Sequence, residues 1–412
     1  MVAPNGIGLS EFEAALRQGK SGIRFLPELV DLQFSCQVGG IPELDKVNMS
    51  DYFTPLQVKN LKSKSILYGC IAAADAWNDA GLKINEQPDW DMGCIFGAGI
   101  TGIELVRESI YKVDDYKVKR LGSTMVEQTM GSGISAHLGG MFGLGNQVTS
   151  NSSACSTGTE AIIMGLERIR SGKAKRMLVG SCDSSGAYAW GGFDSMRVLN
   201  RKSNHEPEKA SKPMSQHASG FVPGSGSGAM IIEEYESAKE RGAEIYAEIL
   251  GGHINSGGQR QGGTMTAPNS IGIQRCIGKS IEDAEIESNE IDAISGHLTS
   301  TMGDVLEIKN WASYLKRKGS DFPYVHSMKS MIGHCLGAAG SIECVGVALQ
   351  LKNNFFHASI NCEEINHEIE AIIDKQKVPS QCFDNTNFNT IAKSSFGFGD
   401  VNSTIIFRKF NE

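Results

Sequence analysis

The chain alternates short runs rich in Val, Ile and Gly with longer segments of helical periodicity. Alternation of this kind predicts a layered α/β fold in which helices pack on sheets. The pattern predicts helices over 65–80, 236–242 and 337–351, and strands over 92–96, 177–181, 229–232, 246–250 and 291–294. The segment 337–351 consists of small and apolar residues apart from one Glu and one Gln. This composition predicts a helix that is buried on most sides.

A faint repeat accompanies this pattern. Twice a polar segment with a reactive side chain leads into a small-residue apolar helix: Cys155 precedes Ala161, and His334 precedes Ala338. The repeat predicts two similar halves with a seam near Glu234, that is, residues 1–234 and 235–412. A length of 412 residues suits two units of this size.

Composition narrows the class of protein. The chain is 40% hydrophobic and 21% charged, as globular proteins are. Its net charge of −8 argues against nucleic-acid binding, which favours a basic excess. No apolar stretch reaches the roughly 18 residues of a membrane span, and the N-terminal residues lack the pattern of a signal peptide. Ten cysteines without a CxxC pair indicate a reducing compartment, so we expect a cytoplasmic protein.

Cys155 is the first candidate for chemistry. A β-prone stretch beginning at Val148 gives way to small residues and ends in Cys155, and a helical pattern with apolar Ile162, Leu166 and Ile169 follows. This placement predicts a thiol at the N-terminus of a helix, where the helix dipole lowers the thiol pKa and favours the thiolate. Taken alone, one cysteine of ten is more often a small buried hydrophobe.

Three downstream segments add polar groups to this thiol. His297 lies in Ser-Gly-His-Leu-Thr-Ser-Thr after a predicted strand, and Lys329 and His334 lie in Ser-Met-Lys-Ser-Met-Ile-Gly-His. Near the C-terminus, Phe396 and Phe398 lie in Ser-Ser-Phe-Gly-Phe-Gly. A cysteine followed by two histidines and a lysine in segments rich in Gly, Ser and Thr favours nucleophilic thiol chemistry with polar assistance.

These four segments, in this order, resemble the β-ketoacyl-acyl-carrier-protein synthases, and most closely the elongating type II enzymes of the Cys-His-His group in the thiolase superfamily. The resemblance covers nearly the whole chain. It implies an α/β fold with thiolase-like duplicated βαβαβ halves in five αβαβα layers. It implies a decarboxylative Claisen condensation of malonyl-ACP with an acyl chain held as a thioester on Cys155, without a cofactor or a metal ion.

The resemblance also implies roles for the polar residues. His297 and His334 would direct their Nε2 groups at the malonyl thioester carbonyl and stabilise the enolate left by loss of CO₂. Lys329 would organise the site through a carboxylate, for which Glu307 is the expected partner.

Backbone and tunnel positions follow from the same resemblance. The N–H groups of Cys155 and Phe398 would form the oxyanion hole, and Phe396 would gate the acyl tunnel. Ile100 matches a tunnel position within Gly97-Ala-Gly-Ile-Thr-Gly. That segment formally fits G-x-G-x-x-G, but no strand-borne acid follows at the distance a dinucleotide site requires.

Acyl carrier protein is the partner that the resemblance implies. Two basic clusters are candidate docking sites for this acidic protein: Lys59, Lys62 and Lys64 form one, and Arg201 and Lys202 belong to the other. A third cluster, over 168–176, ends a predicted helix. Solvation and complementation of helix dipoles are the alternative explanation for each cluster.

Oligomeric state and subunit type remain open at this level. We expect a homodimer with residues 131–144 at the interface, or a heterodimer with a chain-length-factor subunit. A non-elongating scaffold partner normally lacks the nucleophile, so Cys155 argues against it. A starter synthase would carry Asn in place of His334, and a degradative thiolase would carry a second reactive cysteine in a C-terminal CxG motif. Neither signature occurs here.

Departures from the family pattern cluster near the expected substrate entrance. Leu298 replaces the glycine of the first histidine motif; Ser215, Ala218 and Ser219 replace charged residues; and Ser225 replaces a glutamate. We therefore expect a specialised acyl chain, of the polyene, pigment or polyketide kind, rather than ordinary fatty acids.

The N-terminal segment departs as well. Relatives begin with a strand before the turn that matches residues 3–8, whereas this chain starts inside that turn. We expect either a start site assigned too late or the loss of the first strand.

Overall fold

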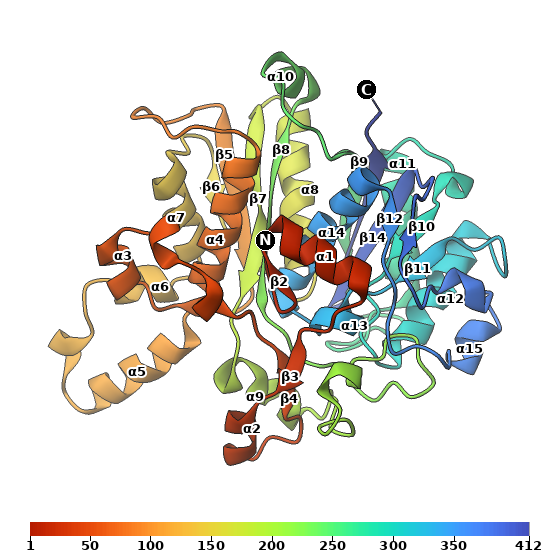
Figure 1. Ribbon diagram of the computed structural model, residues 1–412, viewed down its shortest axis with the longest axis horizontal. Helices are drawn as coiled ribbons and strands as arrows, with labels where there is room; N and C mark the ends of the chain where they lie inside the picture. Colours follow the sequence, from red (N-terminus) through yellow and green to blue (C-terminus); the bar gives the residue numbers. More distant parts are fainter. Residues whose placement is uncertain (412) are drawn as a thin grey trace.

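Two sheets organise the protein, whose computed structural model describes residues 1–411 (Figure 1). The first sheet has the strand order β2 (Gly6–Ile7), β1 (Val2–Ala3), β8 (Gly226–Glu233), β7 (Arg176–Asp183), β5 (Met92–Ala98) and β6 (Val148–Thr149). The second has the order β11 (Tyr324–His326), β10 (Ala293–Ser295), β14 (Thr390–Gly397), β15 (Val401–Lys409) and β9 (Ala247–Ser256). Both sheets mix parallel and antiparallel pairs.

Helices cover the outer face of each sheet and fill the space between the sheets. The helices α4 (Lys64–Asp79) and α7 (Gly133–Phe142) pack on the first sheet, and α11 (Ser270–Asp283) packs on the second beside α12 (Gly303–Leu315). The central layer is formed by α8 (Thr157–Arg170) and α14 (Ala339–Asn353), which contact strands of both sheets. This arrangement confirms the predicted five αβαβα layers.

The central helices pack unusually closely because small residues meet at their crossing. A Cβ at Gly158 would lie 2.3 Å from the backbone nitrogen of Ser341, and one at Gly340 would lie 2.6 Å from that of Thr159. Residues 339–351 of α14 are all buried, as the sequence predicts, and they contain a single charged residue, Glu343. A lone charge inside such a helix requires a partner.

Shorter elements connect these layers. They are α1 (Leu9–Gln18), β3 (Ile23–Phe25), α2 (Pro27–Asp31), β4 (Val38–Gly40), α3 (Pro55–Asn60), α5 (Ile103–Asp114), α6 (Met125–Thr129), α9 (Ala187–Ser195), α10 (Tyr235–Glu240), α13 (Lys329–Ile332), β12 (Phe355–Phe356), α15 (His367–Glu370) and β13 (Phe383–Asp384). The predicted helix 65–80 and the predicted strands at 92, 177, 229, 246 and 291 all occur, each within a few residues of the expected bounds. Among residues 1–411, every helix is too short or too polar to span a lipid bilayer.

The N-terminal residues form a strand of only two residues, Val2–Ala3, beside β8. Its register with β8 is the single pair Val2 and Ser227. The amino group of Met1 is buried against Asp75, 3.2 Å away.

One excursion leaves the layers. The segment containing α5 and α6 projects from the first sheet at the lower left of Figure 1. It exposes large apolar side chains, including Ile110, Tyr111, Tyr116 and Val126. Exposed apolar groups that gather on one excursion mark an interaction surface.

Candidate active site

Cys155 lies on a tight turn directly before α8. Ala154 adopts a positive φ of 48°, a conformation that non-glycine residues rarely adopt outside tight turns and functional sites. The Thr157 hydroxyl fixes the turn, because it accepts the N–H of Ser153 at 2.8 Å and donates to the carbonyl of Ala154 at 2.7 Å. The predicted position of the thiol at a helix N-terminus is thereby confirmed.

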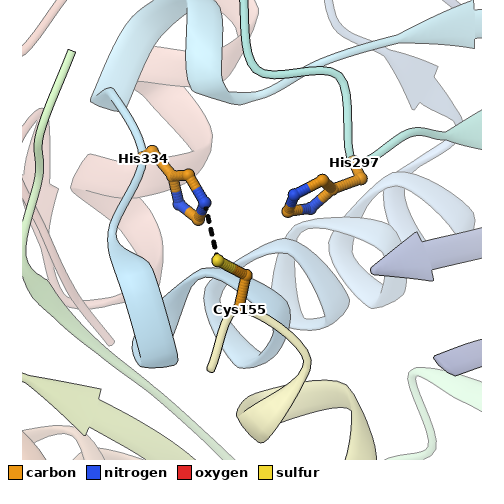
Figure 2. Close-up of side chains that lie close together, drawn as sticks. All are labelled: Cys155, His297 and His334. Atoms are coloured by element: carbon orange, nitrogen blue, oxygen red, sulfur yellow. Dashed lines mark hydrogen bonds between the residues drawn. The ribbon is translucent and has the colours of Figure 1, made fainter. Parts of the chain in front are cut away.

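His334 faces the thiol with one ring nitrogen and the backbone with the other. Nε2 lies 3.1 Å from the Cys155 sulfur (Figure 2), and Nδ1 accepts the N–H of Leu336 at 3.1 Å. Because Nδ1 accepts this hydrogen bond, the neutral ring carries its proton on Nε2. His334 therefore presents an N–H donor to the sulfur and to any group bound beside it.

His297 completes a triangle around the sulfur. It follows β10, and its ring centroid lies 5.3 Å from that of His334 with an interplanar angle of 82°. One nitrogen from each histidine and the Cys155 sulfur lie within 4.8 Å of one another. The sequence shows no metal-ligand spacing here, yet the fold gathers three potential ligands. The tautomer of His334, however, offers a proton rather than a lone pair to the centre, which suits an anion better than a cation.

Both imidazoles are held in the neutral form. The pKa values of His297 and His334 lie well below the usual value, first because of burial and then because the charge of Lys329 lies close by. Neutral N–H donors in a buried site stabilise developing negative charge without prior loss of a proton.

The pKa of the Cys155 thiol differs from the prediction made from the sequence. Cys155 keeps some exposed surface, but its sulfur is enclosed, and burial raises its pKa to about 11. The charge of Lys329 and the backbone N–H of Phe398 act in the opposite direction and only partly offset burial. The expected depression of the pKa by the helix N-terminus is therefore wrong, because desolvation outweighs it.

Lys329 has a different partner from the one expected. Its ammonium lies 2.5 Å from Oε1 of Glu343 on α14, and Lys393 of β14 lies 2.9 Å from the other oxygen, Oε2. All three side chains are buried. Glu307 was predicted to pair with Lys329, and that pairing is wrong.

Glu307 instead holds the backbone of the His297 loop. Its two carboxylate oxygens accept the N–H groups of His297 and Leu298, each at 2.8 Å, and the hydroxyl of Ser394 donates at 2.8 Å. Glu307 thus fixes the position of His297 from behind, through the backbone.

Phe396 and Ile100, the two predicted tunnel residues, have different surroundings. Phe396 is buried, with its ring centroid 6.2 Å from that of His297. Ile100 lies on the turn after β5, where its N–H and that of Gly337 converge on the carboxylate of Asp183 at 3.2 and 2.8 Å. This buried acid fills the space in front of the glycine-rich turn, so the turn is not a phosphate-binding loop.

The two basic clusters lie in different places. Arg201 and Lys202 are exposed and follow Leu199, which bridges to Phe221. The ring of Phe221 in turn lies 5.2 Å from that of His334. The cluster of Lys59, Lys62 and Lys64 is also exposed. It lies beside α6 and the excursion, because Gln128 accepts the N–H of Lys62 at 2.7 Å.

Comparisons with known proteins identify the family. The model of the β-ketoacyl synthase N-terminal domain matches residues 1–238, and that of the C-terminal domain matches residues 246–363. The chain belongs to the β-ketoacyl synthase family. It is 32% identical to 3-oxoacyl-[acyl-carrier-protein] synthase 1 of Haemophilus influenzae, over all of this chain and 97% of that protein.

Two solved ketosynthase structures agree with this family. A β-ketoacyl synthase from Burkholderia phymatum matches with a TM-score of 0.89 and 27% identity, over 100% of this chain and 97% of that one. The ketosynthase of a type II polyketide synthase, in complex with its acyl-carrier protein and bound to the hexaketide, matches with a TM-score of 0.86 and 26% identity over the same shares.

Sequence reasoning missed two buried charges of this synthase, Glu343 and Lys393. A signal for Glu343 was present, since it is the one charged residue of a helix predicted to be buried. Lys393 likewise interrupts the run Thr390-Ile-Ala-Lys of a buried strand. Isolated charges within apolar elements must find a partner, but the pattern does not say which one.

Proposed function

We propose that this chain is an elongating β-ketoacyl-ACP synthase, which condenses malonyl-ACP with an acyl chain carried on Cys155. The observation that carries the proposal is the triangle of Cys155, His297 and His334. It places a nucleophilic sulfur beside two neutral imidazoles in a buried site. Its neighbours add the N–H of Phe398 at the sulfur and the Lys329–Glu343 pair behind it.

Acyl transfer comes first. The Cys155 sulfur attacks the thioester carbonyl of acyl-ACP, and the carrier thiol leaves with a proton. The N–H groups of Cys155 and Phe398 receive the oxyanion of the tetrahedral intermediate. Because the thiol pKa is about 11, only a small fraction is thiolate at neutral pH, so donors that stabilise the anion during attack carry much of the acceleration.

Condensation follows on the acylated enzyme. The bond between the malonyl carboxylate and its α-carbon breaks, CO₂ leaves, and the electron pair forms an enolate whose oxygen accepts N–H groups from His297 and His334. The enolate carbon then attacks the acyl carbonyl, and the Cys155 sulfur departs as the leaving group. Phe396, next to His297, serves as the gate between entrance and tunnel, and Ile100 lines the tunnel.

Carrier docking and dimerisation belong to the same proposal. Arg201 and Lys202 lie close to the entrance through Phe221 and are suited to an acidic carrier. The exposed apolar groups of the α5–α6 excursion and the small residues 131–144 are suited to a two-fold interface. A homodimer is our first choice, and a heterodimer with a chain-length-factor subunit is the alternative. We place the seam of the two halves at 234, between β8 and β9.

We further propose a specialised acyl substrate. Leu298, where the family pattern has glycine, is buried and packs into the core next to the His297 loop. Ser215 bonds the backbone carbonyl of Glu364 instead of supplying a charge at the entrance. Fewer charges at the entrance favour a long or conjugated apolar chain over discrimination by ion pairs.

Intact-protein mass spectrometry tests the proposal. Wild type and Cys155→Ala are mixed with acyl-ACPs that carry saturated, polyene and β-keto chains. An acyl adduct on wild type alone, followed by a β-ketoacyl product when malonyl-ACP is added, is the expected result. An adduct on Cys155→Ala, or no product from any donor in the native assembly, would overturn it. The mass of that assembly separates the homodimer from the heterodimer.

A further inference from the structure

Lys393 is a second buried lysine at the site. It belongs to none of the sequence motifs that carry the resemblance, and it is not part of the triangle of Cys155, His297 and His334. Its side chain is fully buried between β14 and α14, and its ammonium lies 2.9 Å from Oε2 of Glu343. The other oxygen of the same carboxylate pairs with Lys329. One buried carboxylate therefore forms ion pairs with two ammonium groups, although its Oε2 accepts no hydrogen bond from the described residues.

The trio of Lys329, Glu343 and Lys393 by itself carries a net charge of +1. Two buried like charges on one acid are costly, and an apolar side chain in place of Lys393 would remove that cost. A space-filling role does not explain a charge here. The excess charge is useful where a buried anion forms during the reaction, because the anion then neutralises it.

The charged and titratable groups around Lys393 come from several neighbouring elements. They are Glu343 and Cys344 of α14, Lys329 of α13, Glu307 of α12, His326 of β11, His297 after β10, and His334. The charge of Lys393 acts on His297 and His334 in the same direction as that of Lys329, and it lowers the pKa of both imidazoles.

Lys393 also connects Glu343 to the turn that carries the nucleophile. Its ammonium donates to the hydroxyl of Ser395 at 2.9 Å, and that hydroxyl lies 2.9 Å from the hydroxyl of Thr159 on α8. Ser156, next to Cys155, donates its hydroxyl to the carbonyl of Ser395 at 3.1 Å. The lysine therefore ties the acid behind the histidines to the start of the nucleophile helix.

We propose that Lys393 is a positioning residue for the decarboxylation step: it holds the second oxygen of Glu343 and supplies the buried positive charge that the enolate neutralises. This inference rests on the proposed condensing function. In that step the carboxyl–α-carbon bond of the malonyl group breaks, CO₂ departs, and the electron pair remains as the enolate, so one negative charge moves from the carboxylate at the entrance to the oxygen between the histidines.

The test uses Lys393→Met, which keeps the length of the side chain and removes the charge. Lys352→Met is the matched control, because Lys352 lies on α14, the helix that carries Glu343, but is only partly buried and pairs with Glu244 on the surface. Decarboxylation of malonyl-ACP is followed from about pH 5 to about pH 9, and acylation of Cys155 is measured on the same preparations.

We expect Lys393→Met to lower kcat for decarboxylation about tenfold or more. The acid limb of its pH profile should move to higher pH, because loss of a nearby positive charge raises the pKa of both histidines. Acylation of Cys155 should change little, since the backbone oxyanion hole serves that step. Lys352→Met should match wild type in all three measurements.

An acid limb that stays in place while all activities fall together would overturn the inference and leave Lys393 a packing role. Lys393→Gln, which keeps a donor for Ser395, is judged by the same shift if the methionine variant does not fold. If the wild-type enzyme does not decarboxylate malonyl-ACP, the proposed function itself is overturned. If the wild-type enzyme is active and the pH profile of the Lys393 variant has the same acid limb as that of wild type, only the role of Lys393 is overturned.

Discussion

Glu307 holds His297 through the backbone: its carboxylate accepts the His297 N–H at 2.8 Å and makes no hydrogen bond to Nδ1 of the imidazole. The same carboxylate accepts hydrogen bonds from the N–H of Leu298 and from the hydroxyl of Ser394. The Nδ1 atom of His297 is buried without a hydrogen-bond partner within the described chain, so the ring depends on its backbone for orientation.

Glu307→Gln should therefore impair condensation, although the side chain at position 307 makes no contact with the substrate in the proposed mechanism. An amide nitrogen cannot accept a hydrogen bond, so one of three donors loses its partner, at a cost of about 1–3 kcal/mol. We expect kcat for decarboxylation to fall about tenfold, with acylation of Cys155 preserved. Thermal unfolding together with both half-reactions checks this. Equal loss in both half-reactions would contradict a role confined to His297.

The raised thiol pKa predicts how alkylation depends on pH. Below a pKa of about 11 the thiolate fraction grows about tenfold per pH unit, so the rate of iodoacetamide labelling of Cys155 should rise steadily to about pH 10 without a plateau. The signal is the difference between wild type and Cys155→Ala. A plateau near pH 8 would support the lowered pKa that the helix N-terminus alone suggests.

Lys329→Met should slow the same labelling reaction. The charge of Lys329 lowers the pKa of Cys155, so its removal raises that pKa further and reduces the thiolate fraction at pH 8 about threefold or more. Lys352→Met is the control. An unchanged labelling rate would show that Lys329 does not act on the thiol.

Replacement of either active-site histidine should separate the two half-reactions. His297→Ala and His334→Ala each remove an N–H donor to the enolate, which should cost about 10²- to 10³-fold in condensation. Acyl-Cys155 should still form and accumulate, visible as a stable mass adduct. The control is His253→Ala, because His253 is a half-buried histidine on β9 away from the triangle, and this variant should condense normally. Loss of the adduct in the site variants would assign the histidines to acyl transfer instead.

Charge reversal should identify the docking surface. Arg201→Glu with Lys202→Glu should raise KM for acyl-ACP about tenfold at low salt and less at high salt, with kcat nearly unchanged. Lys173→Glu with Lys175→Glu makes the same change in charge just beyond the far end of α8, about 20 Å along the helix from Cys155. An equal effect from both pairs would indicate a general loss of charge. Lys62→Glu with Lys64→Glu tests the cluster of Lys59, Lys62 and Lys64 in the same assay.

Local patterns were sufficient for much of the fold. The strands around Met92, Met177 and Ala229 and the buried helix ending near Leu351 follow from periodicity, and the five-layer arrangement follows from the resemblance of four motifs. The partner of Lys329 could not be predicted from these local patterns. Glu307 precedes Lys329 in the chain and Glu343 follows it, and only the packing of α14 against β14 selects between them.

The predicted direction of the shift in the Cys155 pKa was wrong for a related reason. The helix N-terminus is a local feature that a sequence displays, whereas desolvation depends on what covers the sulfur after folding. Lys393 was missed because a single lysine within a strand carries no motif, although its presence in a buried run was itself a warning.

The order of the site residues along the chain has a consequence for biosynthesis. Cys155 precedes the histidines, and the N–H of Phe398 comes from β14–β15, which ends at Lys409. During translation the thiol leaves the ribosome well before any of its partners, and a nascent chain that lacks these last strands cannot complete the oxyanion hole. The residues around the sulfur therefore come from segments far apart in the chain, and a fragment that ends before β14 cannot form the complete site.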